Sequence, residues 1–321
     1  MKGKDYTYSV AIRTLGKAGN KYQILLNSLL SQTLAPDKIV VYIAKGYEIP
    51  NETINSEKYV FVKKGMVSQR ALEYNEIESD YILFLDDDVY LPPDAVERLF
   101  DALLSQRADV VAPDVFHNAN RPLATKLMMA VSGRMLPRLD DRKWAYKVLK
   151  NAGYSYNSNP SQSIYESQTN AGPCFLCSKE NFLKINFKDE LWLEDCSYAL
   201  GDDQVMFYKM HCCGLKQLTL FNTGIVHMDA GTTLQSLEKE KALVYSDFRF
   251  KTIFWHRFIF KPEKNPHVKL CSIISIIYTF AFTLIISLIK FRFDIFKLKY
   301  NAIKDGINYI YSEEYKKIPL I

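Results

Sequence analysis

Two hydrophobic periods alternate along the first 113 residues of the chain. Short β-branched and aromatic runs predict buried strands at 8–12, 37–43, 59–62, 81–85 and 108–113. Longer stretches with apolar residues three or four positions apart predict helices at 19–33, 66–77 and 92–106. Buried strands that alternate with helices are typical of an α/β fold with a mostly parallel sheet flanked by helices.

The regular alternation stops at residues 114–170, which are rich in Asn, Ser, Tyr and Arg. We interpret this stretch as a variable insertion or a substrate loop. A strand at 172–178, a helix at 202–214 and a short strand that contains His227 restore the pattern. The sheet domain is therefore expected to occupy residues 1–235.

The C-terminal quarter has a different character. Residues 270–289 carry no charge over 20 positions, which is the length of a transmembrane or membrane-embedded helix. Residues 236–269 read as a basic and aromatic amphipathic linker suited to a lipid headgroup layer, and 290–321 as a basic tail. Both flanks of the apolar segment are basic, so spanning, re-entrant and interfacial placements all stay open, as does a buried soluble helix.

Charge adds a partner to this picture. The chain has a net charge of +5, but residues 241–321 alone hold 14 Lys and Arg against 6 Asp and Glu. We therefore expect an anionic membrane surface as a partner of this quarter, and no nucleic acid. A solvated basic tail is the alternative interpretation.

The six cysteines indicate a reducing compartment, because no secretory hydrophobic segment opens the chain. Cys174 and Cys177 form a C-x-x-C pair, and His-Cys-Cys follows at 211–213. A zinc site is conceivable from this spacing. We favour a structural interpretation, with the pair in a buried strand and the triplet at the end of a helix.

The stretch "ILFLDDDVYLPPDA" (82–95) ends a buried strand on Asp86, Asp87 and Asp88. Adjacent carboxylates are costly unless something positive neutralises them. A hard divalent cation with oxygen ligands, Mn²⁺ or Mg²⁺, would do so at the carboxyl end of the strand and would also bind phosphate oxygens. An acidic turn that caps the following helix explains one of the three aspartates but not all of them.

Two further polar points follow along the chain. Asp202 and Asp203 fall at the start of a predicted helix, where they either cap it or supply a general base. His227 ends a short apolar strand and reads as a structural histidine when taken alone. An aspartate cluster in the same cleft would make it a metal ligand instead.

These points, in this order, resemble a family 2 glycosyltransferase of the inverting, nucleotide-sugar-dependent type with a GT-A fold. The resemblance covers about residues 6–235. Its most specific stretch is 65–99, which is similar to the basic-residue helix, fourth strand and D-x-D motif of that family. "GPCFLCSKENF" (172–182) and "GDDQVMFYKMHCCG" (201–214) resemble its acceptor-side strand and its acidic-pair helix.

The resemblance implies a role for each candidate residue. Asp88 would hold the metal ion, Mn²⁺ or Mg²⁺, with His227 as a second ligand. Thr14, Arg70, Asp86 and Asp87 would seat the nucleotide sugar, with Asp86 against the ribose or the metal shell. Asp203 would be the catalytic base, with Asp202 as the alternative. The implied partners are a nucleotide-diphosphate sugar and a glycan or lipid-linked glycan acceptor, at the cytoplasmic face of the inner membrane of a bacterium that builds surface polysaccharide.

Three departures from the family pattern stand out. Lys45 replaces an acid expected after the second strand, Arg13 stands before Thr14 where proline is usual, and the acidic pair is Asp-Asp instead of Glu-Asp. A decayed, membrane-anchored scaffold and a sugar nucleotidyltransferase are therefore the alternatives. A dinucleotide dehydrogenase is disfavoured, because no G-x-G-x-x-G follows the first strand.

Overall fold

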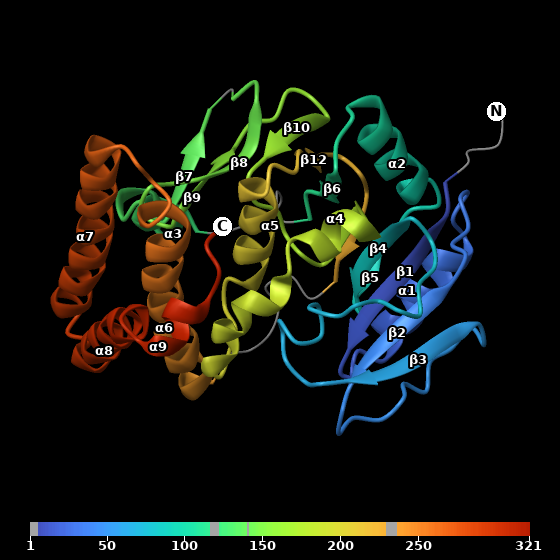
Figure 1. Ribbon diagram of the computed structural model, residues 1–321, viewed down its shortest axis with the longest axis horizontal. Helices are drawn as coiled ribbons and strands as arrows, with labels where there is room; N and C mark the ends of the chain where they lie inside the picture. The colour runs from blue at the N-terminus through green and yellow to red at the C-terminus, as the bar shows by residue number, and fades with distance from the viewer. Residues whose placement is uncertain (1–5, 116–121, 140, 229–235) are drawn as a thin grey trace.

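The strands of the computed structural model follow the hydrophobic runs closely. The structure describes residues 6–115, 122–139, 141–228 and 236–321 (Figure 1). Its strands are β1 (Tyr8–Thr14), β2 (Ile39–Ala44), β3 (Glu57–Val62), β4 (Tyr81–Asp86), β5 (Val89–Tyr90), β6 (Val110–Pro113), β7 (Met135–Arg138), β8 (Trp144–Val148), β9 (Tyr154–Asn157), β10 (Ile164–Ser167), β11 (Cys174–Ser178), β12 (Gln217–Leu220) and β13 (Val226–His227).

The helices cover both faces of the sheet and build the C-terminal end of the molecule. They are α1 (Asn20–Leu30), α2 (Ala95–Ser105), α3 (Leu123–Val131), α4 (Lys179–Lys184), α5 (Asp202–Cys212), α6 (Leu237–Phe254), α7 (Pro266–Ile289), α8 (Phe293–Ile310) and α9 (Glu313–Lys317). A 3₁₀ segment, η1 (Phe187–Asp195), precedes α5, and a π-helical segment, η2 (Trp255–Phe260), continues α6.

The main sheet has the order β3-β2-β1-β4-β11-β6-β12-β10-β8-β9-β7 over the described residues. Strands β1 to β4 are parallel, whereas β11 is antiparallel to both of its neighbours, β4 and β6. The sheet is thus mixed, with its parallel half at the N-terminal end of the chain. The predicted α/β fold with helices on both faces is confirmed.

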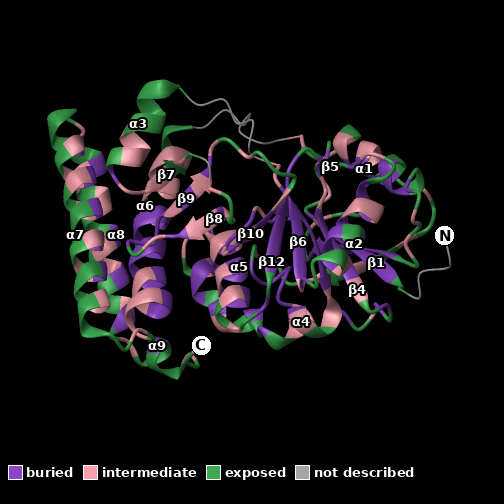
Figure 2. Cartoon of the chain, turned by 90° about the horizontal axis from the view of Figure 1, so that it is seen from above, coloured by how far each residue is buried: buried purple, intermediate pink, exposed green. Residues whose placement is uncertain are grey.

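Two hydrophobic cores lie on opposite faces of this sheet. One is formed with α1 and α2 and contains Leu25, Leu29 and Leu99. The other is formed with α4, η1, α5, α6 and η2 and contains Val205 and Phe254. Figure 2 shows buried residues concentrated in the strands and in the inward faces of these helices.

The predicted helix at 66–77 is wrong. All of these residues are described, and they form turns and irregular chain instead of a helix. The apolar side chains that suggested it, including Val67, Ala71 and Ile77, are buried in the core as expected. Tyr74, however, has a φ of 52°, in the left-handed region where an α-helix of L-residues does not continue.

The predicted insertion at 114–170 is ordered over its described residues. It contributes α3 and the four strands β7 to β10, which extend the sheet beyond β12. Residues 116–121 and 140 lie outside the described residues, as do 229–235, which include the end of the strand expected around His227. Short strands with Asn, Ser and Tyr lack a strong hydrophobic period, which is why their sequence read as a loop.

The segment that read as a basic and aromatic linker has different surroundings from the expected headgroup layer. Phe250, Phe254 and Phe258 are buried in the core shared with α5. The cations between them are paired: the Arg257 guanidinium binds the carboxylate of Glu190, and Lys251 binds Asp247. Helix α6 and η2 therefore complete the core of the sheet domain.

Candidate functional site

The parallel pairing of β1 and β4 places the first two candidate residues side by side. Arg13 at the end of β1 is in register with Asp86 at the end of β4. Because the carboxyl ends of parallel strands meet at one edge of the sheet, the polar residues that follow both strands gather there. This edge is where the structure brings Thr14 and the three aspartates together.

Arg13 donates two hydrogen bonds to the Asp86 carboxylate. Its Nε donates to Oδ1, and its Nη2 donates to Oδ2 at 2.9 Å. Burial alone would raise the pKa of Asp86, but the Arg13 charge and these bonds hold it below its ordinary value. Asp86 is thus ionised, and Arg13 occupies both of its oxygens.

Asp87 turns toward the first strand instead. Its carboxylate accepts a hydrogen bond from the Thr14 hydroxyl, which in turn accepts one from the backbone N–H of Gly16 at 2.7 Å. Burial, together with the negative charges on either side, raises the pKa of Asp87 to about 6 despite the bond from Thr14. Asp87 therefore supports the loop after β1, where Thr14 lies.

Asp88 meets His227 through a small second sheet. Strands β5 and β13 pair antiparallel, and the backbone N–H of Met228 donates to the Asp88 carbonyl at 2.9 Å. This pairing sets His227 Nε2 at 3.1 Å from Asp88 Oδ1. Burial works against protonation of His227, but the Asp88 carboxylate raises its pKa above the ordinary value.

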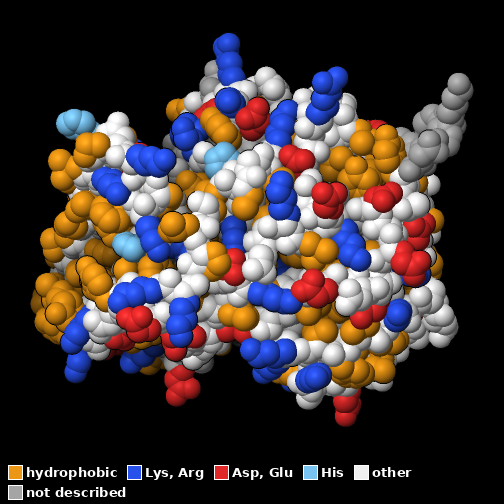
Figure 3. All heavy atoms as spheres, viewed as in Figure 1, with side chains coloured by type: hydrophobic (Ala, Val, Ile, Leu, Met, Phe, Trp, Pro, Cys, Tyr) orange, Lys and Arg blue, Asp and Glu red, His pale blue; other side chains and the backbone are white. Residues whose placement is uncertain are grey.

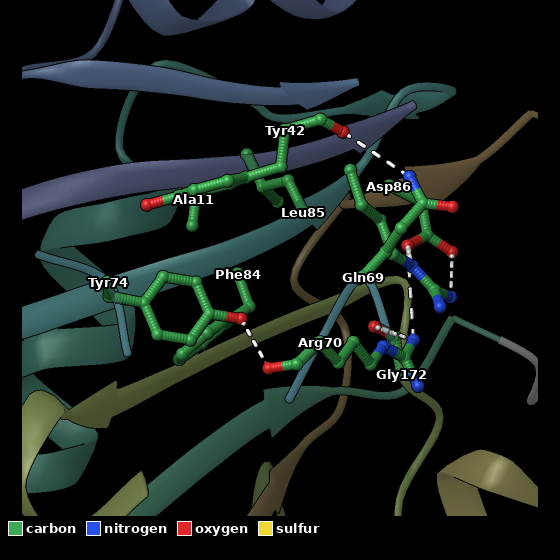
Figure 4. A pocket seen from close by; sticks show the side chains of 10 residues that line it. Ala11, Tyr42, Gln69, Arg70, Tyr74, Phe84, Leu85, Asp86 and Gly172 are labelled. Atoms are coloured by element: carbon green, nitrogen blue, oxygen red, sulfur yellow. Dashed lines mark hydrogen bonds and ion pairs between the residues drawn. The ribbon is translucent and has the colours of Figure 1, made fainter. Parts of the chain in front are cut away.

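The acidic pair Asp202 and Asp203 contacts Arg70. The Arg70 guanidinium is buried and binds Asp202 Oδ2 at 2.9 Å, the carboxylate of Asp203, and the carbonyl of Gly172 at 3.1 Å. Figure 4 shows Arg70 pointing toward Gly172 beside Asp86, with the Tyr74 hydroxyl bonded to the Arg70 carbonyl. Arg70 therefore faces the acidic pair, and the expected role in seating a nucleotide stays a prediction.

The two acids of the pair have different surroundings. Asp202 is buried and also lies 3.7 Å from an Arg13 nitrogen, whereas the Asp203 side chain is 32% exposed and accepts a bond from the Gly172 N–H at 3.0 Å. Burial and the adjacent Asp203 charge raise the pKa of Asp202 to about 6, against the opposing effect of Arg70. Of the two, Asp203 is the carboxylate that solvent or a substrate reaches.

One cavity opens over the end of the parallel strands. It has a volume of about 320 Å³ and is lined by Arg13, Thr14, Lys17, Gln69, Asp86, Asp87, Asp88 and His227, together with three apolar residues. Five of the eight residues predicted for the site, all but Arg70, Asp202 and Asp203, therefore share one pocket.

A second cavity lies on the far side of the acidic pair. It has a volume of about 470 Å³ and is lined by Asp202, Asp203 and Asn170, with Tyr146, Tyr154 and Tyr156 from the added strands. Tyr146 of β8 pairs directly with Tyr156 of β9, so both rings project from the same face of the sheet. The cavity is polar at the carboxylates and aromatic at its wall.

A metal ion at this site would find two ligands in the described chain. Asp88 and His227 lie close enough to bind one ion, but the described residues contain no group of three His, Cys, Asp or Glu that could hold a metal. A cation held by one carboxylate and completed by substrate phosphates and water fits this arrangement. The imidazole nitrogen favours Mn²⁺ over Mg²⁺, which prefers oxygen ligands.

Arg13 is the residue whose role sequence reasoning missed. A cation directly before Thr14, at the end of a strand next to three aspartates, was the available signal. Lys45, by contrast, is exposed at the end of β2 and does not line either cavity.

The C-x-x-C pair is divided by the sheet. Cys174 lies in the core with α1 and α2, and Cys177 in the core on the other face. Residues three apart on a strand point to opposite sides, so the two thiols cannot share a zinc ion. Burial raises the pKa of both thiols. The structural interpretation of this pair therefore fits the structure.

The fold is similar to those of known structures. A structure of GalNAc-T7 with UDP, GalNAc and Mn²⁺ matches with a TM-score of 0.50 and 12% identity over 78% of this chain. The structure of S. aureus TarS matches with a TM-score of 0.47 and 13% identity over 84% of the chain. The chain spans about half the length of the first and 43% of the second. The first similarity confirms a GT-A-like fold.

A family model also matches one part of the chain. Residues 53–161 match the model described as glycosyl transferase family 2, and the predicted resemblance to this family is thereby confirmed. The matched region contains Arg70 and the three aspartates, whereas Thr14, Asp203 and His227 lie outside it. No curated protein matches the chain.

Proposed function

We propose that this protein is an inverting glycosyltransferase. It moves a sugar from a nucleotide-diphosphate sugar to a hydroxyl of a glycan or lipid-linked glycan. The observation that carries the proposal is the arrangement of two cavities around one cluster of two arginines and the acids Asp86, Asp202 and Asp203. One cavity offers a pair of metal ligands, and the other offers an accessible carboxylate.

The cavity over β1 and β4 is assigned to the donor. Asp88 and His227 would hold Mn²⁺ or Mg²⁺, which when bound stabilises negative charge on the leaving diphosphate. Thr14 and Asp87 shape the loop against which the nucleotide would lie. Asp86 is occupied by Arg13, so we assign it to positioning this guanidinium at the rim of the cavity.

The cavity with the tyrosines is assigned to the acceptor. Asp203 takes the proton from the acceptor hydroxyl while that oxygen forms a bond to the anomeric carbon. The bond from that carbon to the diphosphate oxygen breaks on the opposite side, so the configuration inverts. The tyrosine wall suits a sugar ring, which stacks its C–H face on an aromatic ring and hydrogen-bonds at its edge.

The proposed setting of the reaction is a membrane surface. We assign it to surface polysaccharide synthesis at the cytoplasmic face of a bacterial inner membrane, with 1–235 as the catalytic domain, α6 and η2 completing its core, and 266–321 as the membrane-associating part. Helix α7 supports this assignment: in the described chain it is the one helix long and apolar enough to cross a bilayer.

Thermal unfolding with a panel of nucleotide-diphosphate sugars, with and without Mn²⁺, tests the proposal. A ligand that binds the native state raises the midpoint by mass action. We expect one donor to stabilise the protein only with the metal, and that donor to be hydrolysed or transferred. Asp203→Asn should keep the stabilisation and lose the turnover.

Three results would contradict this assignment. Stabilisation by no donor in the panel would favour a non-catalytic scaffold. Full turnover by Asp203→Asn would remove this residue as the base. Release of inorganic diphosphate from a nucleoside triphosphate and a sugar phosphate would favour a nucleotidyltransferase instead.

A further inference from the structure

Helix α7 buries its polar face and exposes its apolar face, which is the reverse of a surface helix in a water-soluble protein. The residues that it buries against the protein are spaced three or four apart and are mostly small and polar: Ser272, Ile276, Thr279, Thr283 and Ser287. Its outward residues are large and apolar, and include Leu270, Ile274, Ile277, Ile285, Leu288 and Ile289. In water the hydrophobic effect favours the opposite arrangement, so the exposed face of α7 suits an apolar medium.

Specific hydrogen bonds hold α7 against the rest of the protein. The Asn151 amide donates to the Thr279 hydroxyl, and the Tyr278 hydroxyl donates to the carbonyl of Val131 at the end of α3. Lys299 of α8 donates to the Thr283 carbonyl and the Ser287 hydroxyl. Lipid therefore cannot surround α7 on all sides.

Both ends of α7 connect to helices that pack against each other. Helices α6 and α8, which flank α7, pack together so closely that a Cβ on Gly306 would stand 2.7 Å from Thr252. The Tyr245 hydroxyl of α6 also binds Asp305 of α8 at 2.6 Å. Since α8 returns along α6 and bears Lys297, Lys304 and Asp305, it cannot cross a bilayer as the partner of α7.

The apolar outer surface extends beyond α7. On α3, Leu123, Leu127 and Val131 are exposed at a spacing of four. On α8, Phe293 and Tyr300 are exposed between lysines. Figure 3 shows hydrophobic atoms gathered over α7 and α8 at one end of the molecule, with basic side chains at their edge.

A groove of about 340 Å³ lies between α3, α7 and α8. Its apolar wall includes Met128, Phe282 and Ile286, and its charged lining consists of Arg134, Lys290 and Lys299. One nearby carboxylate, Asp247, already binds both Arg134 and Lys251. Among the described residues, no carboxylate lies within ion-pair distance of Lys290 or Lys299.

The cations of this groove repel one another. Burial, and then the positive charge of Arg134, lower the pKa of Lys299 to about 8, with Lys290 and Arg292 adding to the effect and Asp247 opposing it. An anion in the groove would relieve this repulsion. An apolar groove with an uncompensated basic end matches a lipid, whose acyl chains and phosphate divide in the same way.

We propose that α7 lies in the plane of a membrane, with its outer face among the acyl chains, and that the groove binds the phosphate of an anionic phospholipid. The protein is then attached to one leaflet and does not span the bilayer. Helix α3 lines both this groove and, through Lys126, the tyrosine cavity. A lipid-linked acceptor would therefore reach the tyrosine cavity along the membrane surface, a consequence that rests on the proposed function.

Vesicle binding by the full chain tests this proposal without any nucleotide sugar, so its outcome is independent of the proposed function. The probes are vesicles of phosphatidylcholine, with and without phosphatidylglycerol. We expect tighter binding to the anionic vesicles. Replacing both Ile277 and Ile285 by Asp should weaken binding at least about tenfold, because two apolar side chains no longer enter lipid. The control is Leu30→Asp, at an equally exposed position on α1 at the other end of the molecule.

The groove is tested separately by Lys290→Gln, an exposed change that leaves the folded contacts intact. Binding to anionic vesicles should weaken about fivefold, while binding to neutral vesicles stays the same. Lys58→Gln on β3, which is also exposed, should change neither. Circular dichroism confirms that each variant is folded.

Several outcomes would overturn the proposal. Equal binding of wild type and the Ile277/Ile285 variant would exclude α7 as the lipid face, and no effect of Lys290→Gln would exclude the groove. A dimer that forms through α7 and binds no vesicles would make this face a contact between two copies. Protection of the tail at 290–321 from protease added outside the vesicles would show that α7 spans the bilayer.

Discussion

Arg13 and Asp86 form a two-bonded ion pair across adjacent parallel strands, at the mouth of the proposed donor cavity. The pair explains how three consecutive aspartates are tolerated at the end of β4. Arg13 neutralises Asp86, Thr14 binds Asp87, and Asp88 faces His227. Each carboxylate has its own partner, and one of them, Asp88, is left for a metal ion.

Removing the Arg13 guanidinium should destabilise the fold. Arg13→Met leaves Asp86 largely buried without its main partner, and we expect a loss of about 3 kcal/mol in the free energy of unfolding. Denaturant unfolding followed by fluorescence measures it. Lys38→Met, which breaks the exposed pair with Glu78, is the control and should cost far less, because solvent screens that pair. Equal losses of unfolding free energy in the two variants would mean that solvent screens the Arg13–Asp86 pair as strongly as an exposed one.

Metal dependence should separate the aspartates. Asp88→Asn or His227→Gln removes one of two protein ligands, and the Mn²⁺ concentration for half-maximal donor turnover should rise about tenfold or more. Asp86→Asn should leave this concentration nearly unchanged, because Asp86 is bound to Arg13. Titration of Mn²⁺ at saturating donor gives all three values. A larger shift for Asp86→Asn than for Asp88→Asn would place the metal at the other end of the triplet.

Most of the first half of the fold follows from the sequence because β1, β2, β4 and β6 are buried on both faces. Runs such as 39–44 are apolar throughout, as expected for a strand that is covered on both faces. The antiparallel strand β11 is equally apolar, so nothing in its composition reveals its direction. The direction of a strand depends on the segments that connect it to its neighbours, and the hydrophobic pattern does not report how these segments run.

The residues of the site could be predicted from the sequence, but the contacts between their side chains could not. Asp88, Asp203 and His227 stand out as polar residues after apolar strands or at a helix start. That Arg70 would bind both Asp202 and Asp203 depends on a loop with a left-handed residue, Tyr74, which read as a helix. The tyrosine cavity was hidden because it is formed by pairs across β8 and β9, far apart from Asp203 in sequence.

The pH dependence of turnover should report Asp202. Its pKa is raised to about 6 by burial and by the charge of Asp203. Below that pH, Asp202 takes a proton and its ion pair with Arg70 is lost, so that Arg70 binds Asp203 alone and competes with the acceptor hydroxyl for it. We expect kcat/KM to fall below about pH 6. In Asp202→Asn this limb should disappear, because nothing titrates there.

Asp203→Asn provides the comparison at fixed pH. Loss of a general base should lower kcat by about 10²-fold or more, with little change in donor affinity. Asp202→Asn should keep measurable turnover at neutral pH. If Asp202→Asn were the inactive variant and Asp203→Asn the active one, the roles of the two acids would be exchanged.

A last prediction concerns the buried cluster that attaches α6 and η2 to the sheet domain. The Glu190 carboxylate is fully buried, and it binds Arg257 with two bonds, Lys209 at 2.8 Å and the Trp192 indole at 2.7 Å. Glu190→Gln leaves two cations with a neutral partner, so the free energy of unfolding should fall by about 3–5 kcal/mol at neutral pH. Glu73→Gln, in an exposed pair with Lys188, should change it by less than about 1 kcal/mol.

The same cluster has a defined dependence on pH. Burial raises the pKa of Glu190, but Arg257 and Lys209 outweigh it and hold the pKa below its ordinary value of 4.5. A carboxylate with a depressed pKa in the folded state stabilises that state above the unfolded pKa, and the contribution is lost as pH falls through the folded one. The difference in unfolding free energy between wild type and Glu190→Gln should therefore be constant above about pH 5.5 and shrink below about pH 4.5. Denaturant unfolding at a series of pH values measures this difference, and a gap that widened on acidification would mean that Glu190 is protonated in the folded protein.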